Sequence, residues 1–259
     1  MGEGSAEHGP TDAHVEGVTI KGATVRDVVI EGADVRGSLL RRIRLRGTDI
    51  VDVDISGELH NVIVNGVDIV PLVEAELDRR TPERAKMRPD DSDGFREAWA
   101  ILGRLWEGTL ARARTFPPAA LQEEVGDEWS FIQTLRHLNF ASAAWVGRMA
   151  LGDPSPWHPL DLPWDEAPGW QGIPWDRDAR PTLDEVLVVR DRRRQVVGDF
   201  LAELSDERLA STVTRTEPGW PRAEDFPLKE CLSIVLNEEW HHRLFAERDL
   251  SLLEPPATA

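Results

Sequence analysis

A five-residue period runs through the first quarter of the chain. Every fifth residue from position 20 to position 55 is apolar, without exception: Ile20, Val25, Ile30, Val35, Leu40, Leu45, Ile50 and Ile55. The positions two before each of these are small or β-branched. A helix repeats every 3.6 residues and a flat strand every two, so neither produces this spacing. The pattern predicts a repeat architecture, with a few strands of accidental spacing as the alternative.

A period of five with a large apolar residue at its centre resembles the pentapeptide-repeat family. That resemblance implies a short right-handed β-helix, with one repeat per side and about two coils between residues 16 and 57. Solenoid repeats cannot bury their apolar faces alone, so we expect capping or docking on another domain. We assign residues 16–70 to this unit and residues 1–15, which are Gly-rich and polar, to a disordered N-terminus. Residues 71–93 form a connector, with a short helix expected near Val73 to Arg79.

The rest of the chain is patterned as amphipathic helices. Two of them open with capping-box residues, Ser130 with Gln133 and Thr182 with Glu185. The four stretches cover Gly94 to Thr115, Ser130 to Leu151, Thr182 to Leu204, and Pro227 to Leu253. They predict an up-down four-helix bundle over residues 94–259. The expected fold class is therefore mixed and mainly α, with the bundle preceded by the short β-helix.

The composition limits which binding partners and which cellular compartment we expect for this protein. The 259 residues carry a net charge of −17, which argues against nucleic acid because phosphate binding needs a basic surface. Apolar runs are too short to span a bilayer and the N-terminus has no apolar signal core, so no membrane partner is expected. The single cysteine, Cys231, indicates a reducing, cytoplasmic setting and is interpreted as a core residue rather than a catalytic thiol. We expect a monomer or a homodimer.

Two titratable residues lie on the apolar stripe of the last helix. Glu238 and His242 are four residues apart, which places them on one face, one turn from each other. His137 lies on the second helix among small neighbours. Together the three supply nitrogen and oxygen donors suited to Zn²⁺ or a similar divalent ion, with a fourth position open. The alternative is a helix-surface pair beside an unrelated core histidine.

Four further residues near this pair are candidates for other roles. Glu239 is the second choice as the carboxylate ligand, and Glu239 and His241 are candidates for a general base. His241 points away from the ligand pair, so a surface position is the alternative for it. Arg243 and Arg248 are candidates for contacts with a polar cosubstrate, with ordinary helix-surface charge as the alternative.

Residues 94–253 resemble the DinB-like superfamily, four-helix bundles with a metal centre. The resemblance lies in EWSFIQTLRHL, the Trp- and Pro-rich segment that follows it, and LNEEWHHRLFAERDL. Many members bind metal through three histidines. The branch typified by mycothiol-dependent maleylpyruvate isomerase uses His, Glu and His, with Glu four residues before the last His. This pattern carries over to His137, Glu238 and His242.

The resemblance also implies a function. We expect a divalent-metal-dependent thiol S-transferase or thiol-assisted isomerase that activates a low-molecular-weight thiol, such as mycothiol, as a metal-bound thiolate. Its partners would be this small-molecule thiol and an electrophilic substrate. Two alternatives stay open: a metal-dependent hydrolase using the same site, and a non-catalytic stress-response or binding module with a structural metal.

The long connection between the second and third helices is rich in tryptophan. It contains Trp157, Trp164, Trp170 and Trp175 and is too long to be a passive link. It either lines the mouth of the metal pocket or is stapled by its tryptophans to the rest of the protein. We do not expect His158, which lies within it, to be a ligand.

Overall fold

The computed structural model describes residues 18–254, apart from positions 24–25, 36–37, 127, 166, 170–172, 217–219 and 222–223. The predicted disordered segment 1–15, Val25 and Trp170 lie outside the described residues. The chain divides into two compact units, Met1–Gly57 and Glu58–Ala259. The division falls at the end of the five-residue pattern, earlier than residue 70, where the sequence analysis places the end of the first unit.

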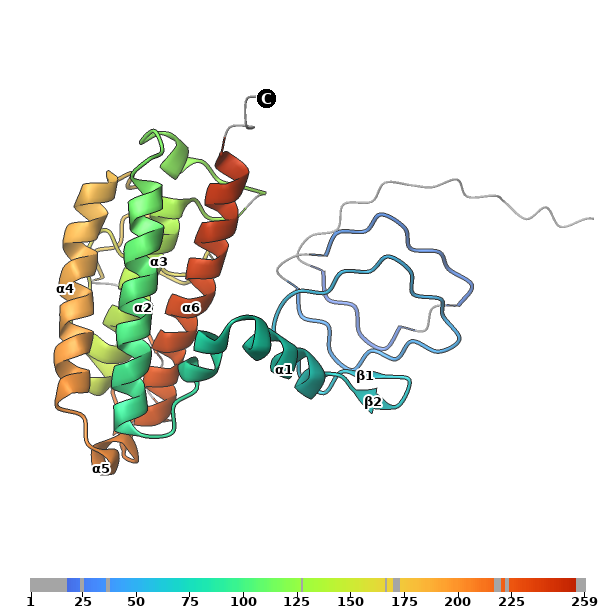
Figure 1. The fold of residues 1–259 in the computed structure, drawn as a ribbon, viewed down its shortest axis with the longest axis horizontal. Coiled ribbons are helices and arrows are strands. Elements are labelled where there is room, and N and C mark those ends of the chain that lie inside the picture. Colours follow the sequence, from blue (N-terminus) through green and yellow to red (C-terminus); the bar gives the residue numbers. More distant parts are fainter. Residues whose placement is uncertain are drawn as a thin grey trace, which may run out of the picture. The chain divides into compact units, whose positions relative to one another are not determined.

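Among the described residues of the first unit, backbone corners recur at five-residue spacing, and the winding path of this part of the chain is visible in Figure 1. A positive φ marks these corners at Gly22, Asp27, Gly32, Arg42, Gly47, Asp52 and Gly57. Glycine and aspartate adopt this left-handed conformation more readily than other residues, which explains their places in the repeat. No hydrogen-bonded strand occurs among the described residues from 18 to 57, so a β-helix is not seen there.

A small hairpin opens the second unit. Strands β1 (Ile63–Val64) and β2 (Val67–Asp68) pair antiparallel around Asn65 and Gly66, both with positive φ. An Asn-Gly pair is the favoured sequence for such a two-residue turn. Helix α1 (Val70–Arg80) and the 3-10 helix η1 (Pro82–Met87) follow, so the predicted connector is largely helical.

Four long helices form the body of the second unit (Figure 1). They are α2 (Ser92–Ala113), α3 (Phe131–Ser142) with its extension η3 (Ala143–Ala150), α4 (Leu183–Ala202) and α6 (Leu228–Leu253). Shorter elements join them: η2 (Ala120–Gln122), α5 (Asp206–Leu209), and the hairpin of β3 (Thr212–Thr214) with β4 (Asp225–Pro227). Both predicted capping boxes are formed, at Ser130 and at Thr182.

The extension η3 is a π-helix, whereas the sequence pattern predicts an α-helix as far as Leu151. All eight of its residues are buried. A π-helix differs from an α-helix in its hydrogen bonds, which apolar spacing does not reveal. Gly147 allows the following segment to pack closely here, because a β-carbon at this position would lie 2.9 Å from Cβ of Pro156.

Helix directions depart from the expected up-down order. One apolar cluster joins the first halves of α2 and α6 to η3 and the end of α4. The other joins the ends of α2 and α6 to the beginnings of α3 and α4. Helices α3 and α4 are therefore parallel to each other and antiparallel to α2 and α6. The segment between α3 and α4, residues 151–182, must run the length of the bundle, and we call it the crossover.

Within the described part of the chain, no helix has the length and apolar character needed to cross a membrane.

Candidate metal centre

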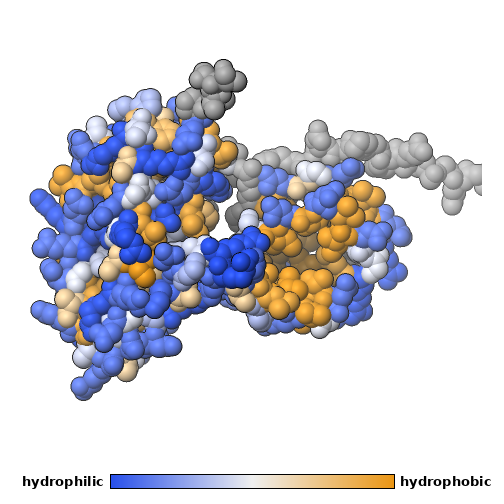
Figure 2. All heavy atoms as spheres, viewed as in Figure 1, coloured by the Kyte–Doolittle hydropathy of each residue, from blue (hydrophilic) through white to orange (hydrophobic). Residues whose placement is uncertain are grey.

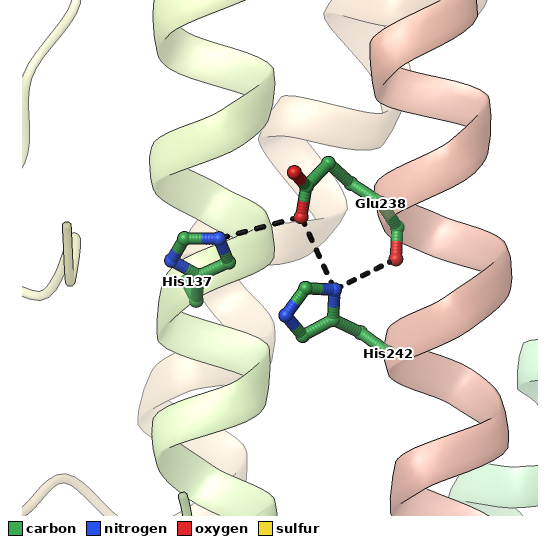
Figure 3. Close-up of side chains that lie close together, drawn as sticks. All are labelled: His137, Glu238 and His242. Atoms are coloured by element: carbon green, nitrogen blue, oxygen red, sulfur yellow. Dashed lines mark hydrogen bonds and ion pairs between the residues drawn. The ribbon is translucent and has the colours of Figure 1, made fainter. Parts of the chain in front are cut away.

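Three side chains from two neighbouring helices of the bundle converge (Figure 3). His137 projects from α3, and Glu238 and His242 project from α6. Oε2 of Glu238 lies 3.4 Å from Nε2 of His137 and 3.1 Å from Nδ1 of His242. One donor atom from each of the three lies within 4.8 Å of the others. The structure thus brings together the three residues that the sequence analysis selects as ligands.

The group occupies a polar layer between the two apolar clusters. On α3, His137 lies between Leu135 of one cluster and Phe140 of the other. Helices α3 and α6 pack side by side, so the imidazole of one faces the i, i+4 pair of the other. The His137 side chain is 10% exposed, against 28% for Glu238 and 18% for His242, so the α6 side of the group is the more open.

A backbone carbonyl fixes the orientation of His137. Its Nδ1 lies 3.0 Å from the carbonyl oxygen of Leu162 in the crossover. The carbonyl can only accept, so Nδ1 carries the proton and Nε2, which faces Glu238, keeps a free lone pair. Metal-binding histidines are commonly held this way by a carbonyl or carboxylate. In His242, Nδ1 lies 3.0 Å from the backbone carbonyl oxygen of Glu238.

The carboxylate of Glu238 fits a cation. Burial raises the pKa of this carboxyl, but the imidazoles of His137 and His242, when they are protonated, outweigh burial and hold the pKa well below its ordinary value. Oε2 is buried and has no partner with hydrogen-bond geometry, despite its short distances to both rings. A buried, unsatisfied carboxylate oxygen is costly unless a cation neutralises it. With two imidazole nitrogens beside it, the donor set suits Zn²⁺ or a similar divalent ion.

Trp129 packs against both imidazoles, although the sequence pattern assigns it no role. Its ring centroid lies 4.5 Å from that of His137 and 6.2 Å from that of His242. The indole nitrogen donates to Asp165 of the crossover at 3.1 Å. The half-buried ring therefore covers one flank of the group. In the sequence, the feature that could have drawn attention to Trp129 is its position directly before the capping box that opens at Ser130.

Arg136 clamps the crossover onto α3. This side chain is fully buried. Its guanidinium donates to four backbone carbonyls of the crossover: Leu160 at 3.0 Å, Ala179 at 2.7 Å, Arg177 at 3.4 Å, and Asp176. In return the backbone N–H of Leu162 donates to the carbonyl of Arg136 at 3.2 Å. The clamp thus places the carbonyl that orients His137. In the sequence, Arg136 could have been identified as a single charged residue among the apolar residues of α3.

Three tryptophans of the crossover, all among the described residues, pack against the bundle. The rings of Trp157, Trp164 and Trp175 lie 6.0, 6.2 and 5.4 Å from that of Phe140. Phe140 in turn lies 5.8 Å from His137. The aromatic residues of the crossover therefore hold it against α3, next to the three ligand candidates. The crossover also contacts His137 directly through the backbone carbonyl of Leu162.

Glu239 lies outside the group, contrary to its ranking as an alternative ligand and general base. Its side chain is 1% exposed and binds Arg190 of α4 through two contacts, at 2.6 and 3.2 Å. The Arg190 guanidinium also lies 4.6 Å from the ring of Trp106. One residue along a helix turns a side chain by about 100°. That rotation takes Glu239 into a buried ion pair across the bundle.

The other candidates on α6 also point elsewhere. His241 contacts Phe245, and burial followed by the charge of Arg84 lowers its pKa. Arg243 faces α2, where Nη1 lies 3.3 Å from Thr109. Arg248 has two carboxylate partners, Glu128 at 2.5 Å and Asp249 at 2.7 Å.

Cys231 and His158 lie away from the three ligand candidates, and their contacts are those of structural residues. Cys231 is fully buried in the first apolar cluster, and burial raises the pKa of its thiol to about 12. Its thiol is therefore a poor nucleophile near neutral pH. Nδ1 of His158 accepts a hydrogen bond from the backbone N–H of Leu160 at 3.1 Å. Neither residue belongs to the group.

Comparison with known proteins agrees with this arrangement. The family model described as DinB superfamily matches residues 101–246, more than half of the chain and the part that holds all three ligand candidates. No curated protein and no solved structure matches the chain significantly. The chain belongs to the DinB superfamily.

Proposed function

We propose that this protein is a divalent-metal-dependent thiol S-transferase or thiol-assisted isomerase, with Zn²⁺ as the ion and a mycothiol-like compound as the thiol. The observation that carries the proposal is the convergence of His137, Glu238 and His242 around a buried carboxylate oxygen without a hydrogen-bond partner. DinB superfamily members commonly bind divalent metals, which supports the same assignment.

Three protein ligands suit a reactive site better than a closed structural one. Structural zinc sites are usually completed by four protein ligands, whereas catalytic sites keep one position for water or substrate. When bound, the ion would supply positive charge that lowers the pKa of a thiol in the fourth position from about 8.5. The greater exposure of Glu238 and His242 gives the thiol an approach from the α6 side.

The surrounding residues hold this site in place. The Leu162 carbonyl keeps the proton of His137 on Nδ1 and leaves Nε2 available as a ligand atom. Trp129 covers one flank and limits the access of water there. Buried and desolvated, these groups act more strongly on charge than they would in water.

The test measures whether turnover depends on a thiol. Purified protein loaded with Zn²⁺ is incubated with an electrophilic substrate, with and without mycothiol, beside the Glu238→Gln variant. We expect turnover only with thiol, and a loss of at least 100-fold in the variant. Turnover without thiol would favour the hydrolase alternative. Binding of metal with no thiol-dependent turnover for any electrophile would favour the non-catalytic alternative.

We also propose that the N-terminal unit is a pentapeptide-repeat segment with a docking role. The five-residue spacing of its apolar positions and of its backbone corners supports this. It carries none of the three ligand candidates.

A further inference from the structure

A pocket of about 190 Å³ lies between the crossover and α4. None of the three ligand candidates lines it, and Phe140 packs against both Trp157 of the pocket and His137 of the candidate metal centre. A pocket of this volume holds a ligand smaller than most drugs. Two residues of the crossover and four of α4 form its lining: Trp157, His158, Val189, Arg192, Arg193 and Val196.

Every polar side chain in this lining is a hydrogen-bond donor. The guanidinium groups of Arg192 and Arg193 can only donate, and so can the indole of Trp157. Nδ1 of His158 accepts a hydrogen bond from the backbone N–H of Leu160 at 3.1 Å, so the neutral ring carries its proton on Nε2. Burial, followed by the charges of Arg193 and Arg192, lowers the pKa of His158, which keeps the ring neutral at pH 7. The lining side chains therefore offer donors and no acceptor, which selects an anion.

A buried carboxylate holds one of the two arginines in place. Oδ2 of Asp161 lies 3.3 Å from Nη2 of Arg193 and accepts a hydrogen bond from the backbone N–H of His158 at 2.8 Å. Asp161 is fully buried and does not line the pocket. Arg192 is exposed, and no ion pair joins it to a carboxylate within the described part of the chain. Its charge is therefore available to a ligand.

We propose that this pocket binds a small organic carboxylate, with the carboxylate on Arg192 and Arg193 and an apolar or planar body against Trp157. An arginine fork matches a carboxylate through two parallel hydrogen bonds. Val189 and Val196 complete the apolar wall, which inorganic phosphate has no apolar atoms to fill. The bound ligand bridges the crossover and α4.

Most of the remaining surface does not attract anions. The chain carries a net charge of −17, and the face of the helical unit visible in Figure 2 is largely hydrophilic. Long-range electrostatic forces therefore act against a carboxylate over most of the molecule. Residues 190–194 of α4 are an exception, because they comprise four arginines and one aspartate. Specific binding of a carboxylate has to come from local contacts such as those in the pocket.

Isothermal titration calorimetry of the full chain with benzoate tests the proposal. Benzamide serves as the neutral counterpart of benzoate, and inorganic phosphate as an anion without an apolar body. Arg192→Gln removes a charge from the pocket, and Val196→Glu places a carboxylate in it. The controls lie outside the pocket: Arg104→Gln on α2, which also removes an exposed arginine, and Leu244→Glu on α6. Val196 and Leu244 are both 40% exposed, so their substitution costs are comparable.

We expect saturable binding of benzoate at millimolar concentration or below. Benzamide and phosphate should bind at least about ten-fold more weakly, and each pocket variant should weaken benzoate binding by a similar factor. The two controls should bind benzoate like the wild type, and circular dichroism establishes that all four variants are folded.

Three results would each overturn the proposal. The first is no binding of benzoate, and the second is binding of benzamide or phosphate as tight as that of benzoate. The third is benzoate binding that Arg192→Gln leaves unchanged, which would place the carboxylate elsewhere, for example on the metal. The titration involves no thiol and no turnover, so its failure leaves the proposed function untouched.

Discussion

Replacing Arg136 with glutamine should weaken metal binding although Arg136 is not a ligand. The clamp fixes residues 160–162, and the Leu162 carbonyl lies 3.0 Å from Nδ1 of His137. A glutamine amide has two N–H donors and therefore cannot donate hydrogen bonds to all four carbonyls. With the clamp lost, the carbonyl is free to shift, and His137 is no longer held in one tautomer and orientation. The perturbation therefore reaches the site through one defined hydrogen bond.

The expected magnitudes follow from the number and kind of contacts. Charge-assisted hydrogen bonds contribute about 1.5–3 kcal/mol each, and part of this is offset by the cost of burying the guanidinium. We therefore expect the free energy of unfolding to fall by about 2–4 kcal/mol. Loss of a group that orients a ligand typically weakens metal binding by about 10–100-fold, or about 1.4–2.7 kcal/mol.

The assay is competition for Zn²⁺ with a chromophoric chelator, paired with urea unfolding followed by circular dichroism. Arg96→Gln is the matched control, because Nη1 of Arg96 donates to the carbonyls of Leu201 at 2.9 Å and Leu204 at 3.0 Å, outside the site. We expect the control to lose stability and keep its metal affinity. Unchanged affinity in Arg136→Gln, or an equal loss in both variants, would refute the reasoning.

Three further predictions concern buried groups outside the triad. Glu239→Gln should lower the free energy of unfolding by about 3–5 kcal/mol in urea titrations, because it leaves the Arg190 charge buried and uncompensated; a loss under 1 kcal/mol would contradict this. Burial raises the pKa of Asp161 from 3.8 to about 6, so the folded protein binds this proton more tightly than the unfolded chain. Raising the pH from about 4 to above 6 should therefore destabilise the wild type by up to about 3 kcal/mol more than Asp161→Asn, as measured by unfolding at each pH; parallel pH profiles would contradict it. Cys231 should resist iodoacetamide at pH 8 in the folded protein and react in urea, as followed by mass spectrometry, whereas fast labelling of the folded protein would argue against its burial.

The helices and the ligand candidates could be predicted because their signals are local. Apolar spacing and the capping residues Ser130 and Thr182 define helix starts to within a few residues. The i, i+4 spacing of Glu238 and His242 places both on one face whatever the rest of the fold does. A single turn of helix thus contains most of the information about two of the three ligand candidates.

What the sequence analysis missed depends on contacts between distant residues. Glu238 and Glu239 are adjacent and chemically identical, and the structure separates them through Arg190, which lies on another helix. The support of His137 comes from Leu162, a carbonyl in a segment without periodicity. Helix directions likewise depend on how the crossover spans the bundle. Local patterns carry no information on such pairings.

The central claim is that His137, Glu238 and His242 bind one divalent ion, and elemental analysis of the purified protein tests it most directly. We predict about one equivalent of divalent metal per chain in the wild type. His137→Ala and His242→Ala should each lose it while remaining folded, and His241→Ala, the neighbouring histidine outside the triad, should retain it. A wild type without metal after Zn²⁺ loading, or full metal content in either ligand variant, would contradict the account.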